Sequence, residues 1–395
     1  MGTIRPTPMD QTEGTDEHHD EGRGAATVDR GPALRRVGPA LGRGGRARRA
    51  RPRRGPRAHR RRGPVPLRPL RRQRRPAATA ADGAGAEAAG VVEEVGSGVT
   101  DVAPGDRVVC SYVPSCGTCA ECAAGHPVRC ADAQAANREA RLVTGRRPFR
   151  DASGAELHHH LGVSAFSELT VVSPRSLVPV PDDVPLELAA VFGCAVLTGA
   201  GAVLNTAAVR PGDSVVVVGL GGVGISAVMA AALAGAHPVI AVDTVESKLA
   251  SALAVGATHG VLAGDDAVEG VRELTGGGVT VAVEAAGHPA ALATAYAATR
   301  VGGRVVVAGL PHPRHTVDVP IASLVGEEKS ILGSYMGSAV PRRDLPRLFD
   351  LYAAGLLPAD ALVTSRSVPL DDVNAALDRL HAGTEVRQIL LPGHR

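Results

Sequence analysis

The sequence predicts an α/β protein built on a doubly wound parallel sheet, joined to a second domain made mostly of short β-strands. Three observations support this prediction. Branched apolar runs alternate with alanine-rich helical stretches from Pro211 to Met336, as in repeated strand and helix units. Short strand-like segments around a Pro-Gly-Asp turn occupy residues 85–110. Four cysteines crowd into residues 116–130, a short stretch that has no core of its own.

The segment from Pro211 to Asp243 has the pattern of one complete strand–helix–strand unit. Val215 to Val218 form an unbroken branched-apolar run, which is typical of a parallel strand covered on both faces. The turn GLGGVG follows directly and opens an alanine-rich stretch with helical propensity. A second apolar run, Val239 to Val242, ends in Asp243.

The residue types of this turn fit a site for a pyrophosphate. Gly219 allows a tight turn, Gly221 lets backbone N–H groups approach phosphates, and Gly224 lets the helix lie close to the strand. Asp243, about 20 residues further on, can accept hydrogen bonds from both hydroxyls of an adenosine ribose and would repel a 2′-phosphate. We therefore predict a Rossmann domain that prefers NAD to NADP; the alternative is a glycine-rich turn in another α/β protein. The predicted cofactor-binding residues here are Gly219, Gly221, Gly222, Val223, Gly224 and Asp243.

Length and composition indicate two domains and an appendage. The chain has 395 residues, 44% of them apolar but only 2% aromatic and none of them Trp, so a sizeable core must consist mainly of Val, Leu and Ala. No apolar run reaches the roughly 20 residues of a membrane span, and the start has no signal-peptide pattern. We expect a cytoplasmic protein without a membrane partner.

Residues 1–76 differ in composition from the rest of the chain. They contain 21 Arg, no Lys and 7 acidic residues, whereas the remainder is acidic. From Gly31 to Pro76 nearly all residues are Arg, Gly, Pro or Ala, so we expect disorder. A polybasic arm for nucleic acid is one interpretation, but no aromatic residue precedes Tyr112 to stack on bases, so we expect no such partner. Another hypothesis is that a GC-rich coding sequence was read in a different frame.

The cysteine cluster predicts a structural metal site. Cys116, Cys119, Cys122 and Cys130 follow one another with gaps of two, two and seven residues. Four thiolates on one short lobe suit tetrahedral Zn²⁺, whereas an iron–sulfur run of this kind needs a final gap of three residues followed by Pro. His126 lies inside the lobe, and we expect it to be an exposed loop residue.

The remaining polar stretches offer fewer candidates. Residues 134–162 read as a loop that carries His158, His159 and His160, of which at most one can line a site because adjacent side chains point in different directions. Cys110 reads as an inward-facing strand residue, and His288 and His312 as surface residues near strand ends. Two amphipathic helices, roughly 342–354 and 370–381, precede a final strand over 386–391 that we expect to rejoin the first folded domain.

Taken together, these motifs resemble the zinc-dependent medium-chain alcohol dehydrogenases. The resemblance rests on the four-cysteine lobe, FGCAVLTGAGA, GLGGVG, VDTVESK and the terminal EVRQIL, and it covers about Glu87 to Leu391 but not the first ~80 residues. It implies a GroES-like, mostly β catalytic domain around a Rossmann domain. It further implies that Cys194 is a ligand of a catalytic zinc, that Thr198 lies against the nicotinamide, that Lys248 joins Asp243 at the ribose, and that Arg387 reaches the pyrophosphate.

The chain departs from the family pattern at the catalytic zinc. In the family, this ion binds the alcohol oxygen and has three protein ligands: an early Cys, the His of a Gly-His-Glu stretch, and the Cys that matches Cys194. Here no cysteine precedes Cys110, and the Gly-His-Glu position reads Gly85-Ala86-Glu87. The glutamate that matches Glu87 is an occasional zinc ligand in the family. The predicted catalytic residues are therefore Cys194, Thr198 and Glu87.

These observations lead to one main hypothesis and two alternatives. The main hypothesis is an NAD-dependent oxidoreductase that converts an alcohol to an aldehyde or ketone. We expect it to hold a structural Zn²⁺ and to form a homo-oligomer, either a dimer or a tetramer. The alternatives are a catalytically impaired NAD- and zinc-binding remnant and a zinc-free quinone reductase, although quinone reductases lack the cysteine lobe. The expected domains are 1–76 (disordered), 77–195 (GroES-like, incomplete), 196–336 (Rossmann) and 337–395 (the rest of the catalytic domain).

Overall fold

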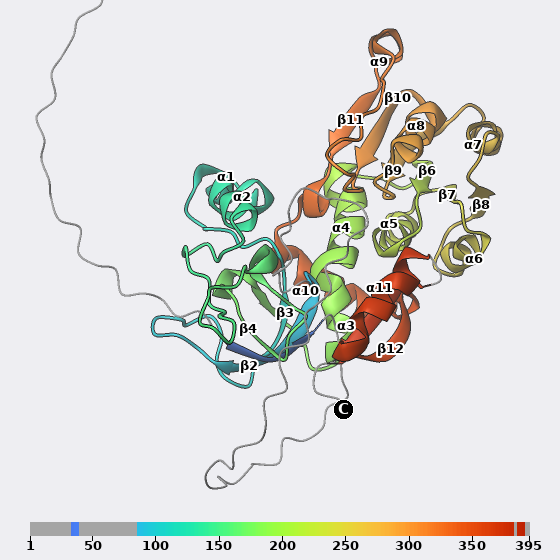
Figure 1. Ribbon diagram of the computed structural model, residues 1–395. Coiled ribbons are helices and arrows are strands. Elements are labelled where there is room, and N and C mark those ends of the chain that lie inside the picture. Colours follow the sequence, from blue (N-terminus) through green and yellow to red (C-terminus); the bar gives the residue numbers. More distant parts are fainter. Residues whose placement is uncertain (1–32, 39–84, 383–384, 392–395) are drawn as a thin grey trace, which may run out of the picture.

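The computed structural model describes residues 33–38, 85–382 and 385–391, and two large sheets organise them (Figure 1). The larger sheet has six parallel strands in the order β11-β10-β9-β6-β7-β8. Its strands are β6 (Val215–Val218), β7 (Val239–Asp243), β8 (His259–Leu262), β9 (Val279–Glu284), β10 (Thr299–Val307) and β11 (Ser330–Gly333). The helices that follow its strands are α5 (Gly222–Leu233), α6 (Glu246–Ala254), α7 (Ala267–Thr275), α8 (Pro289–Ala298) and α9 (Ile321–Gly326).

This strand order confirms the predicted doubly wound sheet. The chain moves outward from β6 through β7 to β8, returns to β9 on the other side of β6, and continues to β11. All four residues of β6 are buried, as expected for a strand with helices on both faces. The order reverses between β6 and β9, and a crevice at the carboxyl ends of the strands at such a point is where doubly wound proteins bind ligands.

The second sheet is antiparallel and has the order β4-β1-β2-β3-β5. Its strands are β1 (Ala33–Gly38), β2 (Ala88–Glu94), β3 (Arg107–Cys110), β4 (Leu169–Val171) and β5 (Leu177–Pro179). Strand β1 pairs with both β2 and β4. These six residues differ from the disorder expected for residues 1–76, because the backbones of β2 and β4 offer hydrogen-bond partners on both sides of β1 whatever its side chains are. The rest of residues 1–76 lies outside the described residues.

A lobe of short helices follows β3 and stands apart from this sheet (Figure 1). It contains α1 (Ala120–Ala123), η1 (Pro127–Arg129) and α2 (Ala131–Arg138). Two further short helices, η2 (His160–Gly162) and η3 (Pro174–Ser176), flank β4. The lobe has few buried side chains apart from Val128, Cys130, Ala133 and Ala136, so its own core is small, as the sequence indicated.

One long helical segment joins the two sheets. It consists of α3 (Leu186–Val191), η4 (Phe192–Val196), α4 (Leu197–Gly201) and η5 (Ala202–Thr206), and η4 and η5 are π-helical turns. Near its start it contacts β2 and β3, and further on it contacts α5. The segment is apolar and 21 residues long, enough to cross a membrane, but 83% of its most apolar window is buried inside the molecule, as in the core helix of a soluble protein.

The C-terminal part returns to the antiparallel sheet. It comprises η6 (Tyr335–Ser338), α10 (Pro341–Ala353), η7 (Ala359–Leu362), β12 (Val363–Pro369), η8 (Leu370–Asp372), α11 (Val373–His381) and β13 (Arg387–Leu391). Helix α10 contacts β5, and β13 contacts β1. Arg342 on α10 forms an ion pair with Asp101 at 2.8 Å. The expected helices and final strand are confirmed, whereas the domain limits 77–195, 196–336 and 337–395 stay a prediction.

Candidate functional site

The four cysteine sulfur atoms of the lobe converge on one point. All four Sγ atoms lie within 4.8 Å of one another, and those of Cys116 and Cys122 are 4.0 Å apart. A zinc ion about 2.3 Å from each of four sulfurs would hold them about 3.8 Å apart in a tetrahedron. Cys116, Cys119, Cys122 and Cys130 therefore have the donor set and the spacing that a structural Zn²⁺ requires.

The surrounding backbone favours thiolates at this site. The N–H groups of Thr118 and Cys119 donate to Cys116 Sγ at 3.5 and 3.3 Å, and these bonds lower the pKa of Cys116 to about 6. Cys130 Sγ accepts from the N–H groups of Cys116 and Ala133. Burial raises the pKa of Cys122 to about 12, so this thiol needs the charge of a bound cation to stay deprotonated.

The glycine-rich turn lies between the end of β6 and the start of α5, where the strand order reverses. Gly219 has φ +95°, and a Cβ there would lie 2.7 Å from the backbone nitrogen of Ala286. A Cβ on Gly224 would lie only 1.8 Å from the carbonyl oxygen of Gly219. At Gly221 a Cβ would meet no atom within 4 Å, so the backbone faces open space there. The turn thus offers free backbone beside a helix N-terminus, which fits a pyrophosphate.

Asp243 fixes this turn from the neighbouring strand. It ends β7, is buried, and its Oδ2 accepts a hydrogen bond from the backbone N–H of Leu220 at 2.7 Å. Its Oδ1 accepts from the N–H of Val245 at 3.0 Å. Lys248 lies in the first turn of α6, half-buried, and no hydrogen bond between its side chain and Asp243 occurs among the described residues. A carboxylate therefore stands where the adenosine ribose is expected.

Arg387 links the glycine-rich turn to the antiparallel sheet. It begins β13, and its Cζ would lie 2.6 Å from a Cβ on Gly222, so the guanidinium lies against the N-terminus of α5. Val223 follows in the same helix turn and is half-buried. Arg387 Nε lies 3.3 Å from Glu87 Oε2. One cation thus contacts both the predicted cofactor turn and a predicted catalytic carboxylate.

Glu87 lies next to Cys194. Glu87 Oε1 accepts a hydrogen bond from the backbone N–H of Ala195 at 3.1 Å, one residue beyond Cys194 in the π-helical turn η4. Burial, and then the negative charge of Glu87, raise the pKa of the Cys194 thiol. One turn further along, Thr198 is buried, and its hydroxyl donates to Met336 Sδ at 3.5 Å.

Two tyrosines that the sequence analysis did not single out complete this site. The rings of Tyr112 and Tyr335 meet edge to face, with centroids 6.2 Å apart. Burial raises the pKa of both, and the next cause in each case is the charge of Cys194, so both lie close to that thiol. Tyr112 follows the end of β3, and Tyr335 follows the end of β11, in a chain with only four Tyr. This position after a strand was the sequence signal that could have identified them as site residues.

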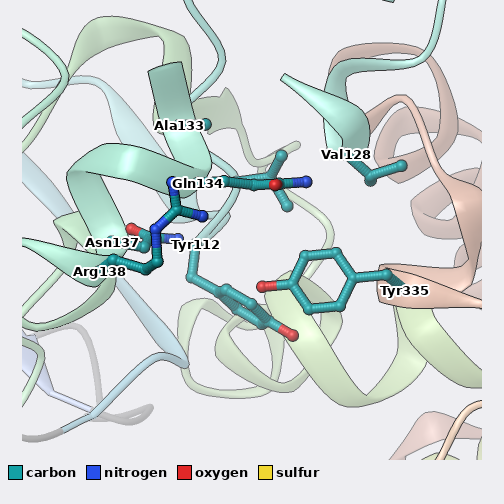
Figure 2. A pocket seen from close by; sticks show the side chains of 8 residues that line it. Tyr112, Val128, Ala133, Gln134, Asn137, Arg138 and Tyr335 are labelled. Atoms are coloured by element: carbon teal, nitrogen blue, oxygen red, sulfur yellow. The ribbon is translucent and has the colours of Figure 1, made fainter. Parts of the chain in front are cut away.

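A pocket of about 310 Å³ opens beside these tyrosines, between the lobe that carries the four cysteines and η6. Figure 2 shows the hydroxyl of Tyr335 directed toward Tyr112, with Gln134, Asn137 and Arg138 of α2 on the opposite wall. The lining residues are Tyr112, Val113, Val128, Ala133, Gln134, Asn137, Arg138 and Tyr335.

The residues around Cys194 do not fit a catalytic zinc. In the described part of the chain, the four-cysteine cluster is the only group of three or more Cys, His, Asp or Glu side chains placed to share one ion. Among the described residues, Glu87 is the carboxylate beside Cys194, and its two oxygens already face the Ala195 N–H and Arg387. A zinc ion needs three protein ligands at such a site. Whether the chain lacks a catalytic zinc therefore stays a prediction.

The remaining Cys and His residues considered in the sequence lie outside this site. Cys110 is fully buried and His126 is exposed, as predicted. His288 caps α8 by accepting from the Ala290 N–H at 3.2 Å, and His312 is half-buried in the loop after β10. His158, His159 and His160 belong to no metal-binding group among the described residues.

His159 is instead a buried part of the antiparallel-sheet domain. Its Nε2 donates to the carbonyl oxygen of Val171, and its Nδ1 lies 2.7 Å from the hydroxyl of Ser164. That hydroxyl accepts from the N–H of His160 and so can donate its proton to Nδ1. Burial lowers the pKa of His159 from 6.5 to about 4, because the neutral ring is favoured.

We therefore expect acid to destabilise the protein through His159. A histidine with a lowered pKa contributes stability above pH 6.5, and this contribution is lost as the pH falls toward 4 because the unfolded chain binds the proton more tightly. The loss between pH 7 and pH 5 should be about 2 kcal/mol. Urea unfolding at both pH values should show a decline smaller by that amount in His159→Gln. An equal decline in both proteins would contradict the assignment.

Comparisons with known proteins agree with this geometry. The family model described as "Alcohol dehydrogenase GroES-like domain" matches residues 68–182, a range that begins before Glu87. The model described as "Zinc-binding dehydrogenase" matches residues 222–354. An NDMA-dependent alcohol dehydrogenase from Amycolatopsis methanolica is 40% identical over 311 residues, or 78% of this chain and 83% of the relative.

Solved structures show the same fold. An alcohol dehydrogenase zinc-binding domain protein from Burkholderia ambifaria has a TM-score of 0.74 and 40% identity, covering 78% of this chain and 83% of its own. A benzyl alcohol dehydrogenase from Acinetobacter calcoaceticus has a TM-score of 0.71 and 34% identity, covering 79% and 84%. The residues matched by the two family models include the cysteine lobe, most strands of the antiparallel sheet and most strands of the parallel sheet. The chain therefore belongs to the zinc-dependent medium-chain alcohol dehydrogenase family of oxidoreductases.

Proposed function

We propose that this chain binds NAD(H) and a small alcohol or aldehyde, and that its sites are arranged for hydride transfer between the two. The observation that carries this proposal is the grouping of the glycine-rich turn, Asp243 and Arg387 at the point where the strand order reverses. Relatives of the chain are named as alcohol dehydrogenases. Bound NAD⁺ would supply the hydride acceptor.

The chain's own residues would bind and orient the two reactants. The open backbone at Gly221 and the guanidinium of Arg387 would hold the pyrophosphate, and Asp243 would accept from the ribose hydroxyls. The pocket beside Tyr112 and Tyr335 would hold the apolar part of the alcohol. The four cysteines of the lobe would hold a structural Zn²⁺ that keeps one wall of this pocket in place.

A second candidate function is an NAD- and zinc-binding protein with little turnover. It is favoured by the surroundings of Cys194, where Glu87 is engaged with Arg387 and Ala195 and the described residues place no third ligand beside them. A third candidate, a zinc-free quinone reductase, is disfavoured by the complete cysteine cluster. The zinc content of the protein and its rate of alcohol oxidation separate the first two candidates.

The cofactor assignment predicts a preference for NADH over NADPH. Because Asp243 would repel a 2′-phosphate, NADH should bind at least about tenfold more tightly, or about 1.4 kcal/mol. Fluorescence titration with both cofactors measures this ratio. Asp243→Ser should reduce the ratio toward one, whereas Thr244→Ala, a change at the neighbouring exposed residue, should leave it unchanged. Equal affinities in the unaltered protein would contradict the proposal.

We also propose a cytoplasmic homo-oligomer without nucleic-acid or membrane partners. Helix α9 exposes Ile321 (76%) and Val325 (72%), and β11 next to it is an edge strand of the six-stranded sheet. An apolar patch beside an unpaired strand edge is a favourable contact for a second copy of the chain. Light scattering should therefore give a mass of at least twice the 40.2 kDa of one chain, and a monomer at micromolar concentration would contradict this.

A further inference from the structure

One wall of the pocket beside Tyr112 is polar and comes from a single helix. Gln134, Asn137 and Arg138 lie on α2 at spacings of three and four residues, so their side chains share one face of the helix. All three line the pocket, and Figure 2 shows them gathered opposite Tyr335. The remaining lining residues are small apolar side chains and the two tyrosine rings.

Among the residues that the structure describes, Arg138 is the only charged one that lines this pocket. The acid next to it in sequence, Glu139, pairs instead with Arg141 at 2.6 Å. No carboxylate lies within ion-pair distance of Arg138 in the described part of the chain. A guanidinium presents a planar set of N–H donors that matches a carboxylate with two parallel hydrogen bonds.

Asn137 adds a second unused polar group. Its Oδ1 is buried and has no hydrogen-bond partner among the described residues. Buried polar atoms are normally paired with protein, water or ligand, so this amide is available to a ligand in the pocket. Arg138 and Asn137 thus form a polar end to a pocket whose other walls are apolar.

The tyrosine side of the pocket lies next to the proposed reaction site, because Tyr112 and Cys194 pack against the same core cluster. Tyr112 lies close enough to Cys194 that each changes the pKa of the other, and Glu87 adjoins Cys194. A molecule in the pocket can therefore place one end near Cys194, its body against the tyrosine rings, and its other end near Arg138. The volume of about 310 Å³ accommodates a single-ring compound.

We propose that this pocket selects an alcohol or aldehyde with an aromatic or apolar body and a carboxylate at the far end, which Arg138 binds. This inference rests on the proposed function, because it assumes that the reacting group lies near Cys194. Arg138 is a specificity-determining residue in this proposal and has no part in the chemical step. Neutral alcohols should still enter the pocket but bind more weakly.

The test compares two probes that differ only in the carboxylate: 4-(hydroxymethyl)benzoate and benzyl alcohol. Isothermal titration calorimetry on the full chain, zinc-loaded and saturated with NADH, gives both affinities without any turnover. We expect the carboxylate to bind about tenfold more tightly. Arg138→Gln should remove this difference by lowering the affinity for the carboxylate probe. Arg146→Gln, which removes the same charge from an exposed position of the same region, should preserve it.

The outcomes separate this inference from the proposed function. If NADH and benzyl alcohol bind but the carboxylate gives no advantage, or if the advantage survives in Arg138→Gln, the carboxylate inference is wrong and the proposed function stands. If NADH does not bind, the proposed function fails, and the inference fails with it. Arg138→Lys serves as a further check, because a retained charge without the planar donor set should recover only part of the advantage.

Discussion

Dialysed protein should retain one zinc ion per chain, and Cys122→Ser should reduce this to nearly none. Four sulfur atoms within 4.8 Å of one another complete a tetrahedral site on their own. Losing one thiolate should weaken zinc binding by considerably more than the roughly 10–100-fold that the loss of an outer hydrogen-bond partner costs. Elemental analysis of protein dialysed against a weak chelator measures this directly.

The same variant should also loosen the lobe. Because the lobe buries few side chains, the bound metal supplies much of its folding free energy. Trypsin should then cut rapidly after Arg129 and Arg138, while the six-stranded sheet stays resistant. Cys194→Ser is the matched control, since it removes a thiol outside the lobe and should change neither zinc content nor cleavage. Two zinc ions per chain in the unaltered protein, one of them lost in Cys194→Ser, would show that a catalytic site exists.

Local patterns in the sequence were sufficient for the elements that carry their own signal. The cysteines of the lobe lie within 15 consecutive positions, 116 to 130, so their spacing alone indicates a shared metal. The strand, glycine-rich turn and helix from Val215 onward form one contiguous unit, and Asp243 ends the next strand along. The right-handed connection of successive parallel strands then leaves few possible sheet orders.

Contacts between distant segments could not be predicted in this way. Glu87 meets Arg387, and Tyr112 meets Tyr335, because the long helix from Leu186 to Thr206 brings the two sheets together. The hydrophobic periodicity of the segments that carry these residues does not indicate that they pack together. The three adjacent histidines were equally ambiguous, because only the positions of Ser164 and Val171 make His159 a buried structural residue.

The ion pair between Glu87 and Arg387 bears on catalysis as well as on packing. Of the family's Gly-His-Glu stretch this chain keeps the glycine and the glutamate but not the histidine, and Glu87 faces the guanidinium of Arg387. The negative charge of Glu87 also raises the pKa of Cys194, which favours the protonated thiol in the absence of a metal. We therefore expect the unaltered chain to bind NADH while it oxidises simple alcohols very slowly.

Restoring one ligand should reverse part of this deficit. Ala86→His adds an imidazole directly before Glu87 and would give a set of three ligand types together with Cys194. We expect this variant to hold a second zinc ion at least about 100-fold more tightly than the unaltered chain does, because even an outer hydrogen-bond partner of a metal ligand is worth roughly 10–100-fold. Metal analysis should rise from one to two zinc ions per chain, and NAD⁺-dependent oxidation of benzyl alcohol should increase with it.

Two controls decide whether the second ion binds at the intended site. Ala86→Gln has a side chain of similar reach that is a poor zinc ligand, so it should keep one zinc ion per chain. The double variant Ala86→His, Cys194→Ser should lose the second ion again, because only two of the three ligand types remain. A second ion that survives the loss of Cys194 would place it elsewhere on the protein. If the unaltered chain already oxidised alcohol as fast as the Ala86→His variant does, Cys194 and Glu87 would suffice without a third ligand.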